Sequence, residues 1–165
     1  MIFVTVGHEI GFDRLISALD NWAVHNTEIN LFAQVAKLEE TSYRPKNIDY
    51  KEFLSPAEFS DYFEKSDLVV AHAGMGTIIT AQTMSKPVVI LPRRGHLKET
   101  RNDHQVATAN RFRNRDGIYV ADDETLLGAT IISALRECEY QSLSRSSEYA
   151  EPSLIAAIRD FIHEK

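Results

Sequence analysis

DLVVAHAGMGTIITAQTMSKPVVILP, residues 67–92, is the stretch that decides the fold. Two apolar runs rich in β-branched residues, 68–71 and 88–91, have the length and composition of buried parallel strands. Between them a glycine-containing turn precedes a helix that we expect over 78–84. The stretch therefore predicts a β-α-β unit.

The turn of this unit reads His72-Ala73-Gly74-Met75-Gly76-Thr77. Glycines beside a helix N-terminus let the backbone approach a ligand, and the first N–H groups of the helix have no partner within it. Gly74, Met75, Gly76 and Thr77 are therefore candidates to bind a phosphate or diphosphate. Thr77 is expected to cap the helix or to bind a phosphate oxygen. A tight turn that binds nothing would show the same glycines.

The rest of the chain also alternates between strand-like and helix-like segments. Strands are expected at 1–6, 29–35, 48–53 and 117–121, and helices at 12–25, 56–65, 104–114, 124–137 and from Pro152 onward. Such alternation predicts an α/β fold, a Rossmann-like, doubly wound parallel sheet with helices on both faces. The length of 165 residues fits a single domain, 1–165.

Composition narrows the class of protein. A net charge of −6 and a pI near 5.5 argue against a general nucleic-acid binder. The single cysteine, Cys138, excludes an internal disulfide, and its place in a helical pattern favours a buried, inert thiol. No apolar run approaches the about 18–20 residues of a membrane span, so we expect a cytoplasmic chain. No HExxH, CxxC or Asp-x-Asp pattern occurs, so we expect no metal site.

Taken in order, the motifs resemble the C-terminal, donor-binding domain of glycosyltransferase family 28. The resemblance rests on the turn at 72–77, on the Lys-Pro pair at 86–87, and on the pair His104-Gln105 after a polar loop. It covers Met1 to about Leu135. It implies the C-terminal half of a GT-B glycosyltransferase.

The N-terminal segment is similar to a subgroup in which this domain is a separate polypeptide. The matching residues are IFVTVGHE at 2–9 and FDRLI at 12–16. This subgroup includes the catalytic subunit of the two-part dolichol-linked N-acetylglucosaminyltransferase and exopolysaccharide transferases of the PssE and EpsF type. The chain would then supply the donor half of a two-component enzyme.

The resemblance also implies substrates and partners. The donor would be a UDP-sugar, bound without a cofactor. A membrane-anchored partner subunit would carry the acceptor, a lipid-diphosphate-linked saccharide, and would hold this chain at the inner face of the membrane. The apolar stripe at 154–162 is expected to dock on that partner or to cover the sheet.

Several polar residues are candidates to bind the donor. In the family, the pair that matches His104-Gln105 contacts the donor sugar, and a glutamine can both donate and accept hydrogen bonds. His72 is expected to reach a phosphate or the sugar, or else to be satisfied by the backbone. Arg93 and Arg94 could offset the diphosphate charge.

His8 and Glu9 are the candidates for catalytic base. Inverting glycosyl transfer needs a base that takes the proton of the acceptor hydroxyl. Both residues lie in the loop after the first expected strand, where ligands bind in open α/β sheets. The loop, Gly7-His8-Glu9-Ile10-Gly11-Phe12, is one residue shorter than in the subgroup, and a loop-stabilising or acceptor-binding role is the alternative.

Two other functions remain open. The first is a non-catalytic, nucleotide-binding or scaffolding subunit that activates its membrane partner. The shortened loop supports it, as does Thr80, which stands where the lipid II transferase carries a ribose-binding glutamate. Thr80 would hold one ribose hydroxyl less firmly. The second is a relative of the UDP-sugar epimerases.

Overall fold

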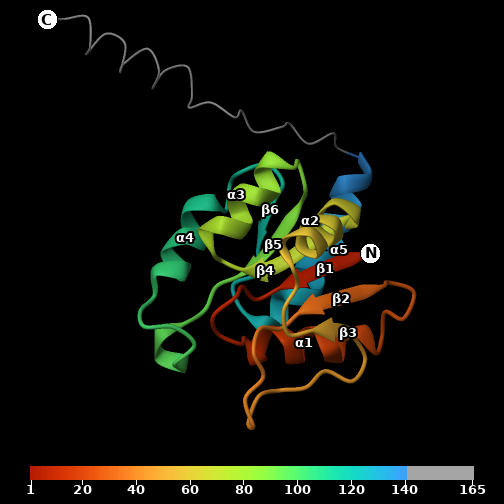
Figure 1. The fold of residues 1–165 in the computed structure, drawn as a ribbon. Coiled ribbons are helices and arrows are strands. Elements are labelled where there is room, and N and C mark those ends of the chain that lie inside the picture. The colour runs from red at the N-terminus through yellow and green to blue at the C-terminus, as the bar shows by residue number, and fades with distance from the viewer. Residues whose placement is uncertain (141–165) are drawn as a thin grey trace, which may run out of the picture.

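The computed structural model describes residues 1–140, so the helix expected from Pro152 and the apolar stripe at 154–162 lie outside the described residues (Figure 1). The elements, in chain order, are β1 (Ile2–Thr5), α1 (Asp13–Ala23), β2 (Leu31–Gln34), β3 (Asp49–Lys51), α2 (Pro56–Lys65), β4 (Leu68–His72), α3 (Met75–Thr83), β5 (Val88–Leu91), the 3₁₀ helix η1 (Gly95–Leu97), α4 (His104–Phe112), β6 (Ile118–Val120) and α5 (Glu124–Tyr140). Within this part of the chain no helix is long and apolar enough to cross a membrane.

The six strands form one parallel sheet in the order β3-β2-β1-β4-β5-β6. All four residues of β1 and of β5 are buried, which explains their nearly continuous apolar sequences. The chain builds one half of the sheet outward from β1 and then returns to place β4 on the other side of β1. The carboxyl ends of β1 and β4 therefore flank the topological switch point, where open α/β sheets bind ligands.

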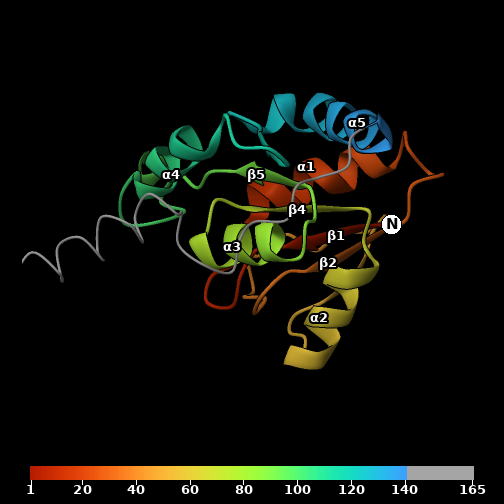
Figure 2. The same ribbon diagram turned by 90° about the horizontal axis from the view of Figure 1, so that it is seen from above.

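Helices cover both faces of this sheet, as the sequence predicts. α1 and α5 lie on one side, and α2 and α3 lie on the other (Figure 2). Alternate residues of β1 serve the two sides, because Val4 belongs to the core under α1 and α5, whereas Phe3 packs against Phe63 of α2. Both cores consist of fully buried apolar side chains, the dominant source of stability in such a fold.

Local side chains cap the starts of α2 and α5. Ser55 and Glu58 form a reciprocal capping box on α2, with Pro56 in its first turn. Asp123 Oδ1 accepts hydrogen bonds from the backbone N–H of Thr125 at 2.9 Å and of Leu126 at 3.2 Å at the start of α5. Both helix starts are therefore fixed by local side chains.

The start of α3 corrects the sequence prediction. The helix begins at Met75 rather than at 78, and Gly74 is its N-cap residue with no side-chain cap. Thr77 therefore lies inside the first turn and does not cap the helix. The apolar pattern used to place the helix becomes visible after Gly76, whereas the backbone of this glycine is already helical.

Two further polar side chains, Asp20 and Cys138, have defined environments. Asp20 of α1 is buried, and its carboxylate accepts hydrogen bonds from the Tyr43 hydroxyl at 2.7 Å and the Asn47 backbone N–H at 2.7 Å. Burial would raise the pKa of Asp20, but these hydrogen bonds outweigh it and lower the pKa. The irregular connection from β2 to β3 is thereby held on α1. Cys138 is half-buried rather than buried, and burial raises the pKa of its thiol.

Candidate functional site

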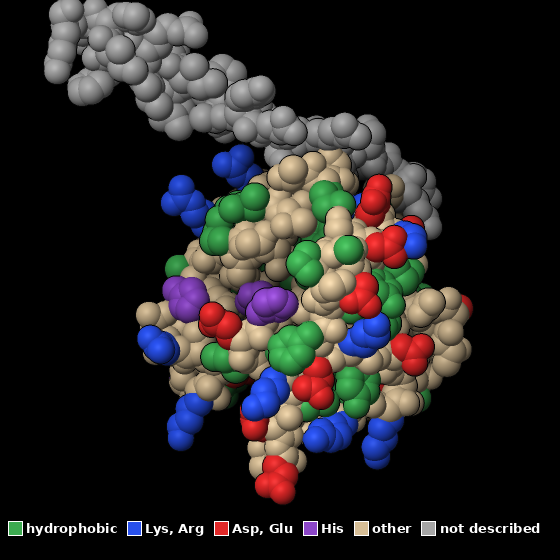
Figure 3. Space-filling model, in the orientation of Figure 1, with side chains coloured by type: hydrophobic (Ala, Val, Ile, Leu, Met, Phe, Trp, Pro, Cys, Tyr) green, Lys and Arg blue, Asp and Glu red, His purple; other side chains and the backbone are tan. Residues whose placement is uncertain are grey.

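A cavity of about 640 Å³ opens at the carboxyl end of the sheet. Three segments line it: the loop after β1, the end of β4 and the connection from β5 to α4. The cavity brings together six of the residues singled out in the sequence: His8, Glu9, His72, Arg93, His104 and Gln105. On the face seen in Figure 3, histidine side chains lie among charged side chains of both signs. The site therefore lies at the topological switch point.

The glycine turn does not line this cavity. Gly74, Met75, Gly76, Thr77 and Thr80 are all absent from its walls. At the start of α3, a Cβ added to Gly76 would meet no described heavy atom within 4 Å, so the backbone there faces open space. The Thr80 hydroxyl donates to the Gly76 carbonyl at 2.9 Å. The helix N-terminus stays accessible to a ligand, and its role in phosphate binding stays a prediction.

His72 links the glycine turn to the cavity. A Cβ on Gly74 would lie 2.2 Å from His72 Nε2, and a Cβ on Gly7 would lie 3.0 Å from His72 Cε1. Gly7 also has a φ of +88°, which favours glycine. The imidazole thus fills a slot between two glycine backbones. Gly74 is explained by this ring, independently of any phosphate.

His72 is held in its neutral form. Burial first, and then the positive charge of Arg93, lower the pKa of His72 from 6.5 to about 4, against an opposing hydrogen bond with the Thr5 backbone. Nδ1 is buried and forms no well-shaped hydrogen bond with the described residues. Near neutral pH the ring therefore offers a hydrogen bond without a charge.

Arg93 has a different environment from the one expected of a diphosphate-binding arginine. Its side chain is 4% exposed, and its guanidinium donates to the carbonyl oxygens of Gly11 at 2.7 Å, Ile10 at 2.7 Å and Val6 at 3.0 Å. Since its N–H groups are used in this way, Arg93 can act on a donor through its charge and through the loop that it binds.

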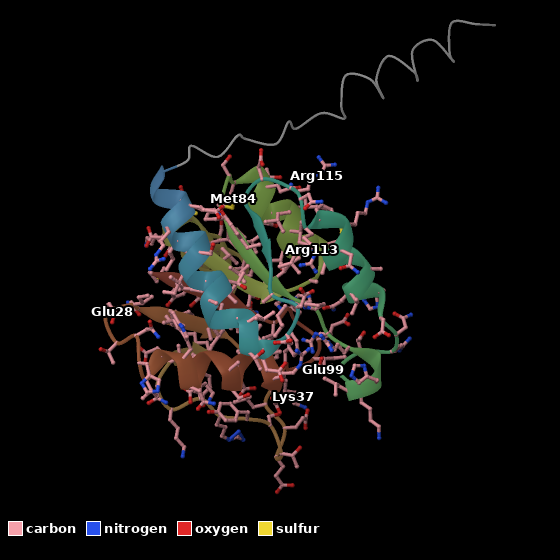
Figure 4. All side chains as sticks on the ribbon, turned by 180° about the vertical axis from the view of Figure 1, so that it is seen from behind. Glu28, Lys37, Met84, Glu99, Arg113 and Arg115 are labelled. Carbon is pink, nitrogen blue, oxygen red and sulfur yellow. The ribbon has the colours of Figure 1, made fainter. Side chains whose placement is uncertain are left out.

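Arg94 is also engaged within the protein. Its backbone N–H donates to Glu99 Oε2 at 2.8 Å, and its Nη2 donates to the Asp122 carbonyl at 2.7 Å. Glu99, labelled in Figure 4, belongs to the connection from β5 to α4, and it also binds Arg14 in the first turn of α1. Arg101, in contrast, is exposed on the cavity wall and forms no ion pair within residues 1–140.

Gln105 and His104 begin α4. Gln105 is buried, and its Oε1 accepts a hydrogen bond from the Arg93 backbone N–H at 3.1 Å. This bond fixes the amide, so that Nε2 remains as the group that can donate to a ligand in the cavity. His104 is exposed, and its Nδ1 pairs with the Asn102 side chain. The other ring nitrogen is then left for a ligand.

The candidate bases occupy the loop after β1. His8 Nδ1 lies 3.4 Å from Gln34 Nε2, and its ring lies 6.1 Å from that of Phe53. Gln34 is itself buried and accepts a hydrogen bond from the Thr5 hydroxyl at 3.2 Å. Glu9 is exposed at the cavity mouth. His8 thus lies beside a buried polar pair, whereas the Glu9 side chain is exposed.

Further residues that line the cavity were not predicted from the sequence as site residues. Gly7, Glu99, Thr100, Arg101 and Asn102 also line the cavity. Glu99, Thr100, Arg101 and Asn102 belong to the polar connection from β5 to α4, whose composition gives no reason to single out individual members. Only Gly7 carried a usable signal, as a glycine that directly follows a central strand.

Comparison with known proteins agrees with this architecture. The model of the glycosyltransferase family 28 C-terminal domain matches residues 1–164. A UDP-N-acetylglucosamine--N-acetylmuramyl-(pentapeptide) pyrophosphoryl-undecaprenol N-acetylglucosamine transferase from Clostridium botulinum (strain Alaska E43 / Type E3) is 28% identical over 91 residues, which are 54% of this chain and 25% of that protein. The chain therefore spans far less than the whole of this curated relative.

Solved structures share the fold. The solution structure of ALG13 matches with a TM-score of 0.56 at 19% identity, covering 94% of this chain and 93% of that one. The glycosyltransferase of kitacinnamycin matches with a TM-score of 0.59 at 18% identity, covering 85% of this chain but 35% of that one. The sheet topology is that of GT-B C-terminal domains, as expected. Because the family model matches nearly the whole length of the chain, the chain belongs to the glycosyltransferase family 28 C-terminal domain family.

Proposed function

We propose that the chain is the donor-binding and catalytic subunit of a two-component, inverting glycosyltransferase. It moves a sugar from a UDP-sugar to a lipid-diphosphate-linked saccharide in exopolysaccharide, capsule or related glycan synthesis. The observation that carries the proposal is the cavity at the switch point, where the His8-Glu9 loop faces the His104-Gln105 segment beside the N-terminus of α3. A donor and an acceptor can meet between these segments.

In this proposal the UDP-sugar spans the helix N-terminus and the cavity. The N–H groups of Met75, Gly76 and Thr77 bind the diphosphate, and the helix dipole favours its charge. Arg101 adds a cation that no carboxylate neutralises in the described part of the chain. Gln105 Nε2 donates to a sugar hydroxyl. Thr80, whose hydroxyl is turned to the Gly76 carbonyl, binds ribose through its remaining acceptor capacity.

Transfer needs a base on the acceptor side of the anomeric carbon. The acceptor oxygen forms a bond to this carbon as the bond to UDP breaks, and the base takes the hydroxyl proton. Glu9 and His8 are the titratable groups of the β1 loop that face the cavity. UDP leaves with its charge held at the α3 N-terminus, so its departure needs no bound metal.

The acceptor site belongs to a membrane-anchored partner at the inner face of the membrane. The match to ALG13, which covers 93% of that chain, supports a domain that works as a separate subunit and receives its acceptor site from a partner. Apolar side chains beside the cavity suit that contact, because Ile10 is 59% exposed and Phe53 is 49% exposed. A partner domain placed over this edge would cover both.

A transfer assay tests the proposal. The chain is added to membranes of its source organism that lack the endogenous chain, and a panel of labelled UDP-sugars is supplied. We expect the wild type to restore label in the lipid-diphosphate fraction, and the double variant His8→Asn/Glu9→Gln to lose most of it. Because the double variant removes both candidate bases, the test does not depend on which of the two takes the proton.

The second candidate, a non-catalytic subunit that activates its partner, predicts a different outcome. It is supported by the engaged hydroxyl of Thr80. In this case the double variant restores label as well as the wild type does, whereas Ile10→Asp, which places a charge among the exposed apolar side chains beside the cavity, abolishes it. The chain would then act only through contact with its partner. Conversion of one UDP-sugar into another by the purified chain without membranes would indicate an epimerase-like enzyme.

A further inference from the structure

The guanidinium of Arg93 lies under the loop that carries both candidate bases. We propose that Arg93 is a positioning residue, which fixes the His8-Glu9 loop relative to the donor-binding segment and so sets the rate of transfer without binding the donor. This proposal rests on the proposed function for its catalytic consequence. Its structural part, the hold on the loop, stands on the geometry alone.

The hydrogen bonds of Arg93 enclose the loop from both ends. Nη2 donates to Val6, which precedes the loop, at 3.0 Å, and to Ile10 at 2.7 Å. Nη1 donates to Gly11, at the far end of the loop, at 2.7 Å. His8 and Glu9 lie between these anchored carbonyls. Their backbone can therefore move relative to β5 only if these bonds break.

The guanidinium is itself held in place. It lies 4.4 Å above the Phe12 ring, a cation–π contact, and it approaches the Glu99 carbonyl at 3.5 Å. The backbone N–H of the same residue binds Gln105 Oε1 at 3.1 Å. Arg93 thus connects the loop of the candidate bases with the residue expected to bind the donor sugar.

A lysine could not reproduce this arrangement. The planar guanidinium presents several N–H groups in a fixed fork, whereas an ammonium group is a compact point charge on a flexible stem. Three carbonyls on two sides of the loop match the fork. Burial lowers the pKa of Arg93 to about 10, so the group still carries its charge near neutral pH.

The first test uses the purified chain and the variant Arg93→Lys, with Arg94→Lys as the matched control. Arg94 is adjacent and also bonded to a carbonyl, but none of its hydrogen bonds within residues 1–140 reaches the loop. We expect amide hydrogen exchange at residues 7–12 to accelerate at least about tenfold in Arg93→Lys and to stay unchanged in Arg94→Lys. Equal exchange in the wild type and Arg93→Lys would overturn the proposal.

The second test separates positioning from binding and from simple destabilisation. UDP affinity of Arg93→Lys should stay within about twofold of the wild type, whereas the transfer rate with membranes should fall roughly 10- to 100-fold at an unchanged donor KM. An increased donor KM with an unchanged maximal rate would place Arg93 in donor binding and overturn the positioning role. Asp20→Asn, which loosens a region away from the cavity, should reduce thermal stability but should leave both the transfer rate and the donor KM unchanged.

A measurement on the wild type covers the case in which Arg93→Lys does not fold. The anchored guanidinium should give separate, slowly exchanging Nη–H signals in the NMR spectrum, and freely averaged signals would overturn the proposal. The outcomes also separate the two claims. Loop loosening in Arg93→Lys with no UDP binding by the wild type, alone or with membranes, would reject the proposed function and retain the hold on the loop.

Discussion

The Arg14 guanidinium and the Glu99 carboxylate form a bidentate ion pair, with Nε at 2.7 Å from Oε1 and Nη2 at 2.8 Å from Oε2. The two residues are 85 positions apart, and their side chains are 12% and 13% exposed. Because Glu99 also binds the backbone N–H of Arg94, the pair joins α1 to the connection from β5 to α4. One wall of the cavity is therefore tied to a helix that begins directly after the candidate-base loop.

Glu99→Gln should cost more stability than the loss of a surface ion pair. The change leaves the largely buried Arg14 with the more exposed Glu124 as its remaining carboxylate partner, so we expect the free energy of unfolding to fall by about 1–3 kcal/mol. Asp61→Asn is the control, since it removes an exposed pair with Lys65 worth about 0.5 kcal/mol or less. Urea denaturation measures both, and equal losses would show that the buried pair has no special weight.

Stability should depend on pH through His72. The folded protein keeps this ring neutral down to a pKa of about 4, against 6.5 for an unshifted histidine, so the unfolded state binds more protons between these values. The contribution is fully present above pH 6.5 and is lost as the pH falls toward 4, up to roughly 3 kcal/mol.

Urea denaturation of the wild type and His72→Asn at pH 7.0, 6.0 and 5.0 checks this expectation. The difference in unfolding free energy between the two proteins should shrink as the pH falls, because the variant has no group to protonate at this position. Depressed carboxylates such as Glu58, with a pKa of about 2, stay ionised in this range and affect both proteins alike. A constant difference across the three pH values would contradict a neutral, buried His72.

Gly74 should be required by His72 rather than by a ligand. A Cβ at position 74 would lie 2.2 Å from His72 Nε2, so Gly74→Ala should destabilise the fold by about 1–3 kcal/mol. Removing the ring should relieve the clash, so the double variant Gly74→Ala/His72→Ala should lose less than the sum of its single changes. Gly76→Ala, with open space around it, is the matched control and should be neutral or stabilising. If the stability losses of the two single variants simply add in the double variant, the His72 ring is not the reason for glycine at position 74.

Arg101 should bind the donor diphosphate. Arg101→Gln should weaken UDP binding by about 5- to 20-fold, as expected for the loss of one charge-assisted contact, and the loss should shrink at high salt. Arg115→Gln is the control, because Arg115 is exposed and lies outside the cavity walls (Figure 4). Calorimetry at two salt concentrations measures both variants, and an equal affinity for wild type and Arg101→Gln would remove Arg101 from the site.

The sheet could be predicted because its information is local. Apolar runs such as 68–71 and 88–91 specify buried parallel strands, and Pro56 directly after Ser55 marks a helix start. All six strands were expected within a few residues of their observed bounds. The start of α3 was misplaced because a glycine-rich first turn has no apolar periodicity.

The hydrogen bonds and ion pairs of the site could not be predicted, because the residues that they join are distant in sequence. Arg93 reaches carbonyls more than 80 residues away, and nothing in the sequence near Arg93 separates a buried anchor from an exposed phosphate ligand. Glu99 and Arg101 are two of many charged residues in a polar connection. Only the fold shows that one of them is paired with Arg14 while the other faces the cavity.

The most direct test of the proposed donor site at the N-terminus of α3 is calorimetric binding of UDP to the wild type and to Gly76→Val. Both proteins are measured with and without membranes that carry the partner. A Cβ at position 76 would meet no described heavy atom within 4 Å, so we expect a valine there to leave the fold intact and to hinder the close approach of a phosphate to the backbone. We predict that the wild type binds UDP and that the folded variant does not. Equal binding by both proteins, or no binding by the wild type even with membranes, would contradict a donor site at this helix N-terminus.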